Sequence, residues 1–211
     1  MQRLAIIGSG DLGQQIAYHA ESDGHYRVVG FFDDFEVRGS IKQEAPVLGG
    51  LHDLMVSYQR GEFDVIMIGI GYKHFQKRRD LFNELVQQIP LGSVLHSSSY
   101  IDKSCQIGKG AFIYPGCVLD MNVVIGDNVL LNAGCVIAHD TVVGNHTFFS
   151  PAVKVAGFVE IGECVSLGIG TTVIDNIKIK SNVRTGGGTV VINNLEQPGL
   201  YVGVPGKLIK S

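Results

Sequence analysis

The sequence predicts two domains of different class, an α/β domain over residues 1–95 and a coiled, parallel β structure over residues 96–211. Three observations support this prediction. A glycine-rich segment directly follows a short apolar run near the N-terminus, which is typical of nucleotide-binding α/β folds. Aliphatic residues recur at every sixth position through the second half, a period that belongs neither to an α-helix nor to a single strand. Most of the 28 glycines lie after residue 100, so the two halves also differ in composition.

The bulk composition favours small-molecule partners. The chain has 17 Lys and Arg against 20 Asp and Glu, so its charge of −3 gives no support for binding nucleic acid or an anionic membrane. The apolar run before the first glycine, residues 4–7, is too short for a secretory signal, and no apolar stretch reaches the roughly 18 residues of a membrane helix. We therefore expect a cytoplasmic protein. The four cysteines form no CxxC pair, and we interpret them as small buried hydrophobic residues.

The N-terminal half begins with a strand, a glycine loop and a helix. Residues 3–7 (RLAII) read as a buried strand, GSGDLG follows at residues 8–13, and a helical pattern runs over residues 12–22. A second strand, YRVVGFF, ends at Asp33 and Asp34. This order matches the Rossmann fingerprint, in which glycines let the backbone approach a phosphate and an acid after the second strand meets a ribose hydroxyl.

The remainder of this half completes a small domain. We expect a strand within VIMIGIG (65–71), a helix over about residues 73–88 and an exit strand over residues 93–95. About ninety residues amount to one mononucleotide-binding half, which leaves no second half for nicotinamide. The glycine loop therefore favours a nucleotide diphosphate over NAD.

From residue 101 the chain divides into hexapeptides without an insertion. The first position is aliphatic in 14 of 16 cases, with Phe149 and Thr185 as the exceptions, and the fifth is always Cys, Ala, Val, Thr or Ile. Six residues on each of three faces give an eighteen-residue coil with the first-position side chains stacked inside it. Gly, Asn and Asp at the third and fourth positions suit tight turns between faces.

This pattern resembles the hexapeptide signature of the left-handed parallel β-helix. The resemblance supplies the handedness, and it implies a homotrimeric acyltransferase with sites between subunits. A rigid scaffold without catalytic activity is the structural alternative.

The two halves together resemble one family. The chain is similar to the bacterial nucleotide-sugar acetyltransferases grouped with the sialic acid O-acetyltransferases. The segments that carry this similarity are the glycine loop with FFDDF, the segment SVLHSSSYID, the hexapeptides with VIAHD, and the terminal VGVPGK. The resemblance covers almost the whole chain. It implies transfer of acetyl from acetyl-CoA to the 4-amino group of a UDP-, GDP- or dTDP-linked amino-deoxysugar. O-acetylation of a sugar hydroxyl and a non-catalytic nucleotide-sugar-binding scaffold remain alternatives.

The family resemblance assigns a base and its helpers. It implies that His139 is the general base, that Asp140 supports its basicity and that the Gly157 amide holds the oxyanion. The repeat adds a geometric argument, because residues eighteen apart stack at roughly 4.8 Å on successive coils and Gly157 then lies beside His139. Asn132, on the coil below, is expected to hydrogen-bond the sugar.

The resemblance also assigns binding residues. It points to the backbone at Ile169 and Gly187 for acetyl-CoA, and glycines at 186–188 would let a pantetheine arm lie close to the chain, although they also suit tight turns. Lys207 is a candidate contact to a CoA phosphate. The positions that match the nucleotide-sugar site are Gly10, Asp11, Asp33, Asp34, Gly71 and Tyr72.

The sequence departs from the family pattern at several positions. Asp11 and Leu12 replace the frequent Gly-His pair, and we expect Asp11 to turn toward a sugar hydroxyl or amine because it would repel a diphosphate. Phe148 stands where the family commonly has a second histidine near the acetyl group. His146 is out of register with that position, and we expect it to be a solvated turn residue. Zinc would need a third ligand beside His139 and His146, so we expect no metal.

Overall fold

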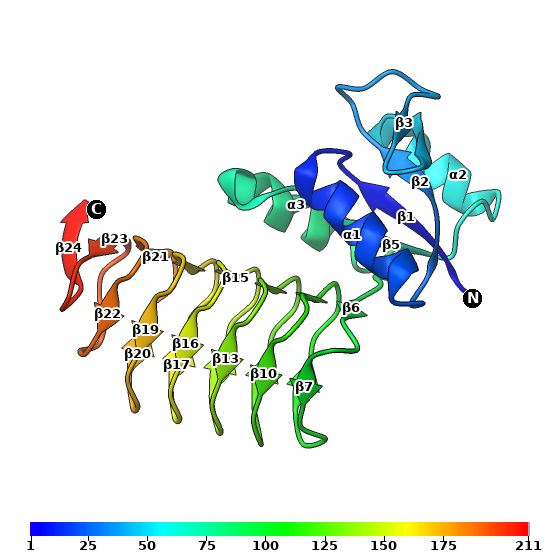
Figure 1. The fold of residues 1–211 in the computed structure, drawn as a ribbon. Coiled ribbons are helices and arrows are strands. Elements are labelled where there is room, and N and C mark those ends of the chain that lie inside the picture. Colours follow the sequence, from blue (N-terminus) through cyan, green and yellow to red (C-terminus); the bar gives the residue numbers. More distant parts are fainter. Residues whose placement is uncertain (211) are drawn as a thin grey trace. The chain divides into compact units, whose positions relative to one another are not determined.

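The computed structural model describes residues 1–210, except for the side chain of Tyr72, and divides into two compact units between Val94 and Leu95 (Figure 1). This division lies one residue before the predicted boundary. We refer to residues 1–94 as the N-terminal unit and to the rest as the helical coil unit.

The N-terminal unit is built on a five-stranded sheet in the order β3-β4-β2-β1-β5. The central strand β1 (Arg3–Ile7) pairs in parallel with β2 (Arg27–Phe32) and with β5 (Val65–Ile68). Strand β1 is buried from its second residue on, as expected for a parallel strand covered on both faces. The remaining elements are β3 (Ile41–Lys42), β4 (Ala45–Gly49), α1 (Asp11–Ser22), η1 (Leu51–Asp53), α2 (Leu54–Gln59), η2 (Tyr72–His74) and α3 (Phe75–Leu85).

The glycine loop packs as the fingerprint predicts. Gly8 has φ +91°, which only glycine adopts readily, and a Cβ on Gly13 would overlap the carbonyl oxygen of Gly8. A Cβ on Gly69, which directly follows β5, would in turn overlap Gly13. The helix α1 can therefore begin directly beside the ends of β1 and β5 because all three residues lack side chains.

Two parts of the N-terminal unit differ from the sequence prediction. The β3–β4 hairpin and α2 were not expected, since both are short and the hairpin contains a proline and two residues of positive φ. The predicted exit strand is also wrong as an element of this domain. Its residues form β6 (Val94–Leu95), which joins a sheet of the helical coil unit beside β9, because Leu95 is a first-position residue eighteen before Ile113.

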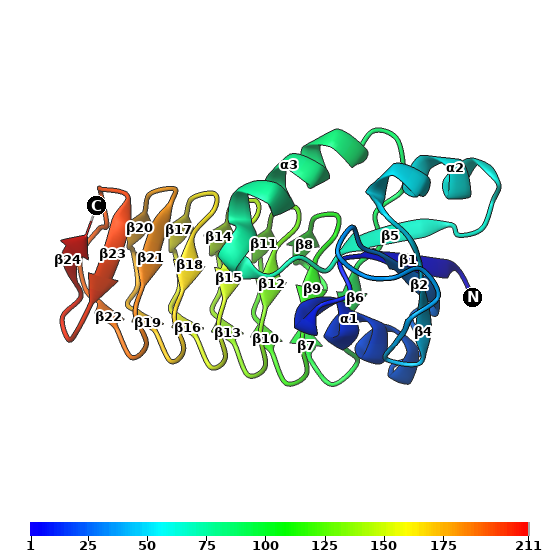
Figure 2. The same ribbon diagram turned by 90° about the horizontal axis from the view of Figure 1, so that it is seen from above.

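The helical coil unit is a left-handed β-helix with three sheets, whose strands are parallel except for the last one of the chain. Its successive coils are seen edge-on in Figure 1 and from above in Figure 2. Each short strand occupies the sixth and first positions of a hexapeptide and pairs with residues eighteen away, as Val118 does with Val136. The strands are β7 (Tyr100–Ile101), β8 (Gln106–Ile107), β9 (Phe112–Ile113), β10 (Val118–Leu119), β11 (Val124–Ile125), β12 (Leu130–Leu131), β13 (Val136–Ile137), β14 (Val142–Val143), β15 (Phe148–Phe149), β16 (Lys154–Val155), β17 (Glu160–Ile161), β18 (Ser166–Leu167), β19 (Thr172–Val173), β20 (Lys178–Ile179), β21 (Val183–Thr185), β22 (Val190–Val191), β23 (Gly199–Val202) and β24 (Lys207–Lys210).

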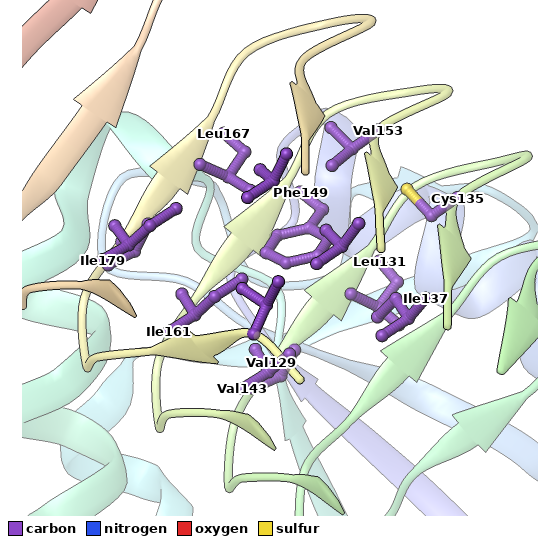
Figure 3. Packing of buried hydrophobic residues seen from close by; sticks show 14 of the residues in the cluster. Val129, Leu131, Cys135, Ile137, Val143, Phe149, Val153, Ile161, Leu167 and Ile179 are labelled. Carbon is purple, nitrogen blue, oxygen red and sulfur yellow. The ribbon is translucent and has the colours of Figure 1, made fainter. Parts of the chain in front are cut away.

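First-position side chains fill the interior of the coils. Phe149, an exception to the aliphatic pattern, lies in the same column as Leu131 and Leu167 and is fully buried (Figure 3). Fifth-position hydroxyls and thiols donate to a backbone carbonyl fifteen residues on, as Thr141 does to Ala156 at 3.0 Å and Cys117 to Asn132 at 3.2 Å. The small polar residues of the repeat therefore connect neighbouring coils.

The fourth position of the hexapeptide adopts the left-handed backbone conformation. Glycine, asparagine and aspartate suit this region, which explains their frequency there. Non-glycine residues with this conformation and φ of 55–63° are Asn122, Asn128, Asp140, His146, Ala152, Phe158, Cys164, Asn176 and Asn182. Side chains at this position leave the turn toward the neighbouring coil or toward solvent.

Among the described residues, no helix is both long and apolar enough to cross a membrane.

Candidate active site

The turn between β13 and β14 carries the predicted base and its acidic neighbour. His139 Nδ1 lies 3.0 Å from Asp140 Oδ2. A hydrogen bond from the Asn122 side-chain amide, and to a smaller extent one from the His139 ring, lowers the pKa of Asp140 below its usual value. This carboxylate is therefore an acceptor at neutral pH. A neutral His139 that donates from Nδ1 to this carboxylate has the lone pair of Nε2 available to take a proton. The His139 side chain is 42% exposed, so substrate can reach it.

Gly157 lies against the imidazole, as the eighteen-residue register predicts. A Cβ at this position would lie 2.7 Å from His139 Cε1 and 2.9 Å from Nε2, so the ring occupies the space that any other side chain would fill. Within residues 1–210 the Gly157 amide donates to no acceptor. The ring of Phe158 meets the imidazole edge to face at a centroid distance of 5.1 Å. The predicted base thus lies beside a buried glycine whose amide makes no hydrogen bond within these residues, and the Phe158 ring forms a second wall.

The residues expected to hold acetyl-CoA lie at a different corner of the coil. Ile169 and Gly187 stack on successive coils, with Gly188 donating to the Ile169 carbonyl at 2.8 Å, and Ile169 is 60% exposed. Their turns follow the β12–β15–β18–β21 sheet, whereas the His139 turn follows the β10–β13–β16 sheet. Asn132 lies at the corner of Ile169, and its side-chain amide donates to Phe149 O at 3.1 Å.

The N-terminal unit contains a cavity of about 490 Å³, a size that suits a small-molecule ligand. Glycines from the loops after β1 and β5 form one side of it, and aromatic and aliphatic side chains form another. The cavity is lined by Ile7, Gly8, Gly10, Phe32, Asp33, Asp34, Phe35, Leu51, Gly69, Ile70, Gly71, His74 and Lys77.

Asp33 and Asp34 line the cavity and also fix its loops. Asp33 Oδ2 accepts hydrogen bonds from the backbone and hydroxyl of Ser9, both at 2.8 Å, and Oδ1 accepts from the Phe35 amide. Burial acts to raise the pKa of Asp33, but the bonds from Ser9 and Phe35 outweigh it and lower the pKa. Asp34 Oδ1 accepts from the Leu51 amide at 2.7 Å.

Asp11 does not line this cavity. It is the first residue of α1, where a carboxylate is favoured by the helix dipole, and it borders a separate depression with Gln14, Gln15, Tyr18 and Gln43. The side chain of Tyr72, also predicted to contact substrate, lies outside the described part of the structure.

His74 and Lys77 line the cavity but were not predicted as site residues. They lie in the run KHFQKRRD at residues 73–80, which gives no motif that separates a ligand-facing cation from a solvated one. Lys77 lies on the first turn of α3, three residues after His74. The buried Arg78 donates from Nη1 to Ile68 O at 2.8 Å and so supports the loop that contains Gly69 and Gly71.

The prediction that His146 is a solvated turn residue is wrong. It does occupy a turn, with φ 59°, but its side chain is buried and its Nδ1 lies 3.1 Å from Asn128 Nδ2 on the preceding coil. All four cysteines were expected to be buried. Cys117 and Cys135 are buried, whereas Cys105 and Cys164 are partly exposed. Among residues 1–210, no group of three or more His, Cys, Asp and Glu side chains is placed to hold a metal ion.

Two family models match the chain. The PglD N-terminal domain matches residues 3–85, and the bacterial transferase hexapeptide of six repeats matches residues 122–157. A search among curated protein sequences finds no match.

Several solved structures share both units. PerB from Caulobacter crescentus, in complex with CoA and GDP-perosamine, is 26% identical with a TM-score of 0.90 over 99% of this chain and 98% of PerB. The acetyltransferase domain of PglB from Neisseria gonorrhoeae is 26% identical with a TM-score of 0.90, over 99% of this chain and 100% of that domain. The same domain with acetyl coenzyme A is 25% identical with a TM-score of 0.88, over 99% of both chains.

These likenesses agree with the geometry of both units. The N-terminal match ends in α3, the hexapeptide match spans the His139 turn, and the similar structures extend over nearly the whole chain. The chain is an acyltransferase that uses acetyl-CoA, and it belongs to the bacterial nucleotide-sugar acetyltransferases of the left-handed β-helix hexapeptide-repeat superfamily.

Proposed function

We propose that this enzyme transfers acetyl from acetyl-CoA to the 4-amino group of a nucleotide-linked amino-deoxysugar. The observation that carries the proposal is the His139 turn, where the imidazole lies between the Asp140 carboxylate and Gly157, whose backbone amide has no acceptor among the described residues. The complex of PerB with CoA and GDP-perosamine supports the choice of acceptor, because that structure is similar over nearly the whole length of both chains.

The chemistry follows from the protonation state of His139. The neutral amine attacks the thioester carbonyl, and Nε2 takes the proton that the nitrogen loses as the new C–N bond forms. The developing imidazolium is stabilised by Asp140 through Nδ1–H. When the C–S bond breaks, the thiolate leaves with the electron pair and the proton held on Nε2 is available to it.

The Gly157 amide is proposed to stabilise the charge on the carbonyl oxygen. An oxyanion donor acts best when it is already oriented and not engaged elsewhere. Gly157 meets the second condition, since its amide has no acceptor among the described residues, and its missing side chain leaves room for the imidazole beside it.

The N-terminal cavity is proposed to hold the nucleotide diphosphate. Backbone amides at glycine loops and a helix N-terminus favour anionic oxygens, and Lys77 adds a positive charge at the cavity wall. Asp33 is proposed to lie beside this ligand, and its bonds to Ser9 show that it also shapes the loop.

We also propose that the enzyme is a homotrimer with each site shared between subunits. In one chain the base and the predicted CoA residues, Ile169 and Gly187, lie at different corners of the coil. A neighbouring copy that presents its Ile169 corner to the His139 corner would complete the site, as closed symmetry permits. A cytoplasmic location and a place in polysaccharide biosynthesis remain predictions.

The test is turnover with a panel of acceptors. Release of CoA thiol would be measured with UDP-, GDP- and dTDP-linked 4-amino sugars, beside the matching 4-hydroxy sugars. We expect transfer to at least one amino sugar and none to its hydroxyl counterpart. His139→Ala should lower kcat by about two to four orders of magnitude, the usual contribution of a general base.

Two results would contradict the proposal. Transfer to hydroxyl acceptors alone would assign O-acetylation to this scaffold, and no thiol release with any acceptor would leave a binding protein without catalytic activity. Turnover of His139→Ala near the wild-type rate would remove the base from the mechanism.

A further inference from the structure

Asn122 contacts the carboxylate that faces the catalytic base. It occupies the fourth position one coil before Asp140, and its Nδ2 donates to Asp140 Oδ1 at 3.0 Å. The other oxygen, Oδ2, lies 3.0 Å from His139 Nδ1. The two oxygens of Asp140 are therefore divided between an amide donor on one side and the imidazole on the other.

The backbone of Asn122 is itself held in place. Its amide donates to Ser104 Oγ at 2.7 Å, and the Ser104 hydroxyl donates to Asp102 Oδ1 at 2.7 Å. The fourth position at this corner is occupied on three successive coils by Ser104, Asn122 and Asp140, so the contacts follow one corner of the coils. The donor that meets Asp140 is thus anchored to the coil before it.

Asp140 needs such a donor because its surroundings are open. Its side chain is 35% exposed, and an aspartate at a turn has several staggered rotamers available. A bond to Oδ1 favours the rotamer that directs Oδ2 at the ring. The same bond is the largest contribution that lowers the pKa of Asp140, so the carboxylate stays an acceptor.

We propose that Asn122 is a positioning residue of the acetyl transfer, which holds Asp140 so that His139 carries its hydrogen on Nδ1 and presents Nε2 to the attacking amine. The inference rests on the proposed function for its consequence in catalysis. Its geometric part, the orientation and tautomer of the imidazole, can be measured without any substrate.

The test removes the amide while preserving the turn. Asn122→Gly keeps a residue that accepts the left-handed backbone at φ 59° and deletes only the side chain. The matched control is Asn182→Gly, at an exposed fourth position with φ 63°, whose side chain makes no hydrogen bond in the described part of the chain. A third variant, Asn122→Asp, suits the turn but places a carboxylate opposite Asp140.

We expect kcat of Asn122→Gly to fall about tenfold, a typical consequence of a small displacement of a catalytic group. The KM values for acetyl-CoA and for the nucleotide sugar should stay within about twofold, since Asn122 contacts neither substrate in this proposal. Asn122→Asp should lose at least as much kcat, and Asn182→Gly should match the wild type.

Nitrogen NMR of the histidine rings gives a second, independent measurement. His139 would be assigned by its absence in His139→Ala, and its neutral form should be mainly the Nδ1–H tautomer in the wild type. In Asn122→Gly the population should shift toward Nε2–H, with no shift in Asn182→Gly.

The outcomes separate the two proposals. Wild-type kcat and tautomer in Asn122→Gly would overturn the role of Asn122, as would an equal loss in Asn182→Gly. If the wild type transfers no acetyl, the proposed function fails, and the NMR comparison still decides whether Asn122 orients the ring.

Discussion

At the scale of single residues, the site depends on the absence of a side chain at position 157. The imidazole of His139 fills the space that a Cβ would need, and within residues 1–210 the amide of Gly157 has no acceptor. The first of these properties requires glycine. The register of eighteen made this contact predictable, because third-position residues on successive coils must stack.

Gly157→Ala tests this arrangement. The added methyl group would displace the His139 ring, whose end is free to move, so we expect little change in thermal stability and a fall in kcat of about a hundredfold. Steady-state kinetics and thermal unfolding of the same preparation would check both parts. The double variant with His139→Ala should be no slower than His139→Ala alone, whereas additive losses would place the effect of Gly157 outside the base.

The residue scale also shows where sequence reasoning was insufficient. Asn128 and His146 lie eighteen residues apart and stack as the register requires, but the exposure of His146 was predicted wrongly. The period specifies which residues stack and leaves open whether a turn side chain folds back or extends into water. Asp33 is similar, because the fingerprint predicts an acid there and its bonds to Ser9 arise only when the two loops meet.

At the scale of elements, the repeat was predictable and the irregular segments were not. A strict six-residue period defines the columns of the β-helix, so the strand pairs eighteen apart follow from the sequence. The residues of β6 were assigned to the N-terminal domain, because a strand of two residues is too short to show a sequence period. The β3–β4 hairpin was missed because its proline and its positive-φ turn resemble a loop.

An ion pair where strands β1 and β5 begin predicts that the stability of the N-terminal unit depends on pH. Arg3, which begins β1, donates to both oxygens of Asp64, which precedes β5, at 2.7 and 3.2 Å, and its backbone amide adds a bond of 2.8 Å. The Arg3 side-chain bond, followed by the backbone bond, lowers the pKa of Asp64 from 3.8 to about 2.

Because the folded-state pKa is depressed, Asp64 stabilises the fold above about pH 4 and loses this contribution as the pH falls toward about 2. Asp64→Asn should therefore unfold at lower urea concentration than the wild type near neutral pH, and the difference should shrink below about pH 4. The helical circular dichroism signal would report it, since all described helices lie in the N-terminal unit. Glu62→Gln controls for the loss of one negative charge, and a difference that is independent of pH would refute the assignment.

At the scale of the whole molecule, the chain separates its functions between two units and between corners of one coil. The cavity proposed to hold the nucleotide is lined by residues of the N-terminal unit, and the proposed base lies on the helical coil unit. The predicted CoA residues occupy a corner of the coil that does not contain the base. The separation of the two corners is not visible from local motifs, since it depends on how many hexapeptides separate two residues.

The shared site of the proposed trimer can be tested by complementation between two inactive variants. His139→Ala lacks the base, and Gly187→Phe would block the acetyl-CoA corner, where even a Cβ lies 3.0 Å from Ile169 Cγ2. When the two variants are coexpressed with different tags and the mixed oligomers are purified, a site between subunits can combine an intact His139 from one chain with an intact Gly187 corner from its neighbour. Each mixed trimer then has one intact site of three, so the purified mixed oligomers should show about a third of the wild-type activity. Mixed oligomers as inactive as either variant alone would show that one chain supplies both halves, and sedimentation of the wild type would establish the number of subunits.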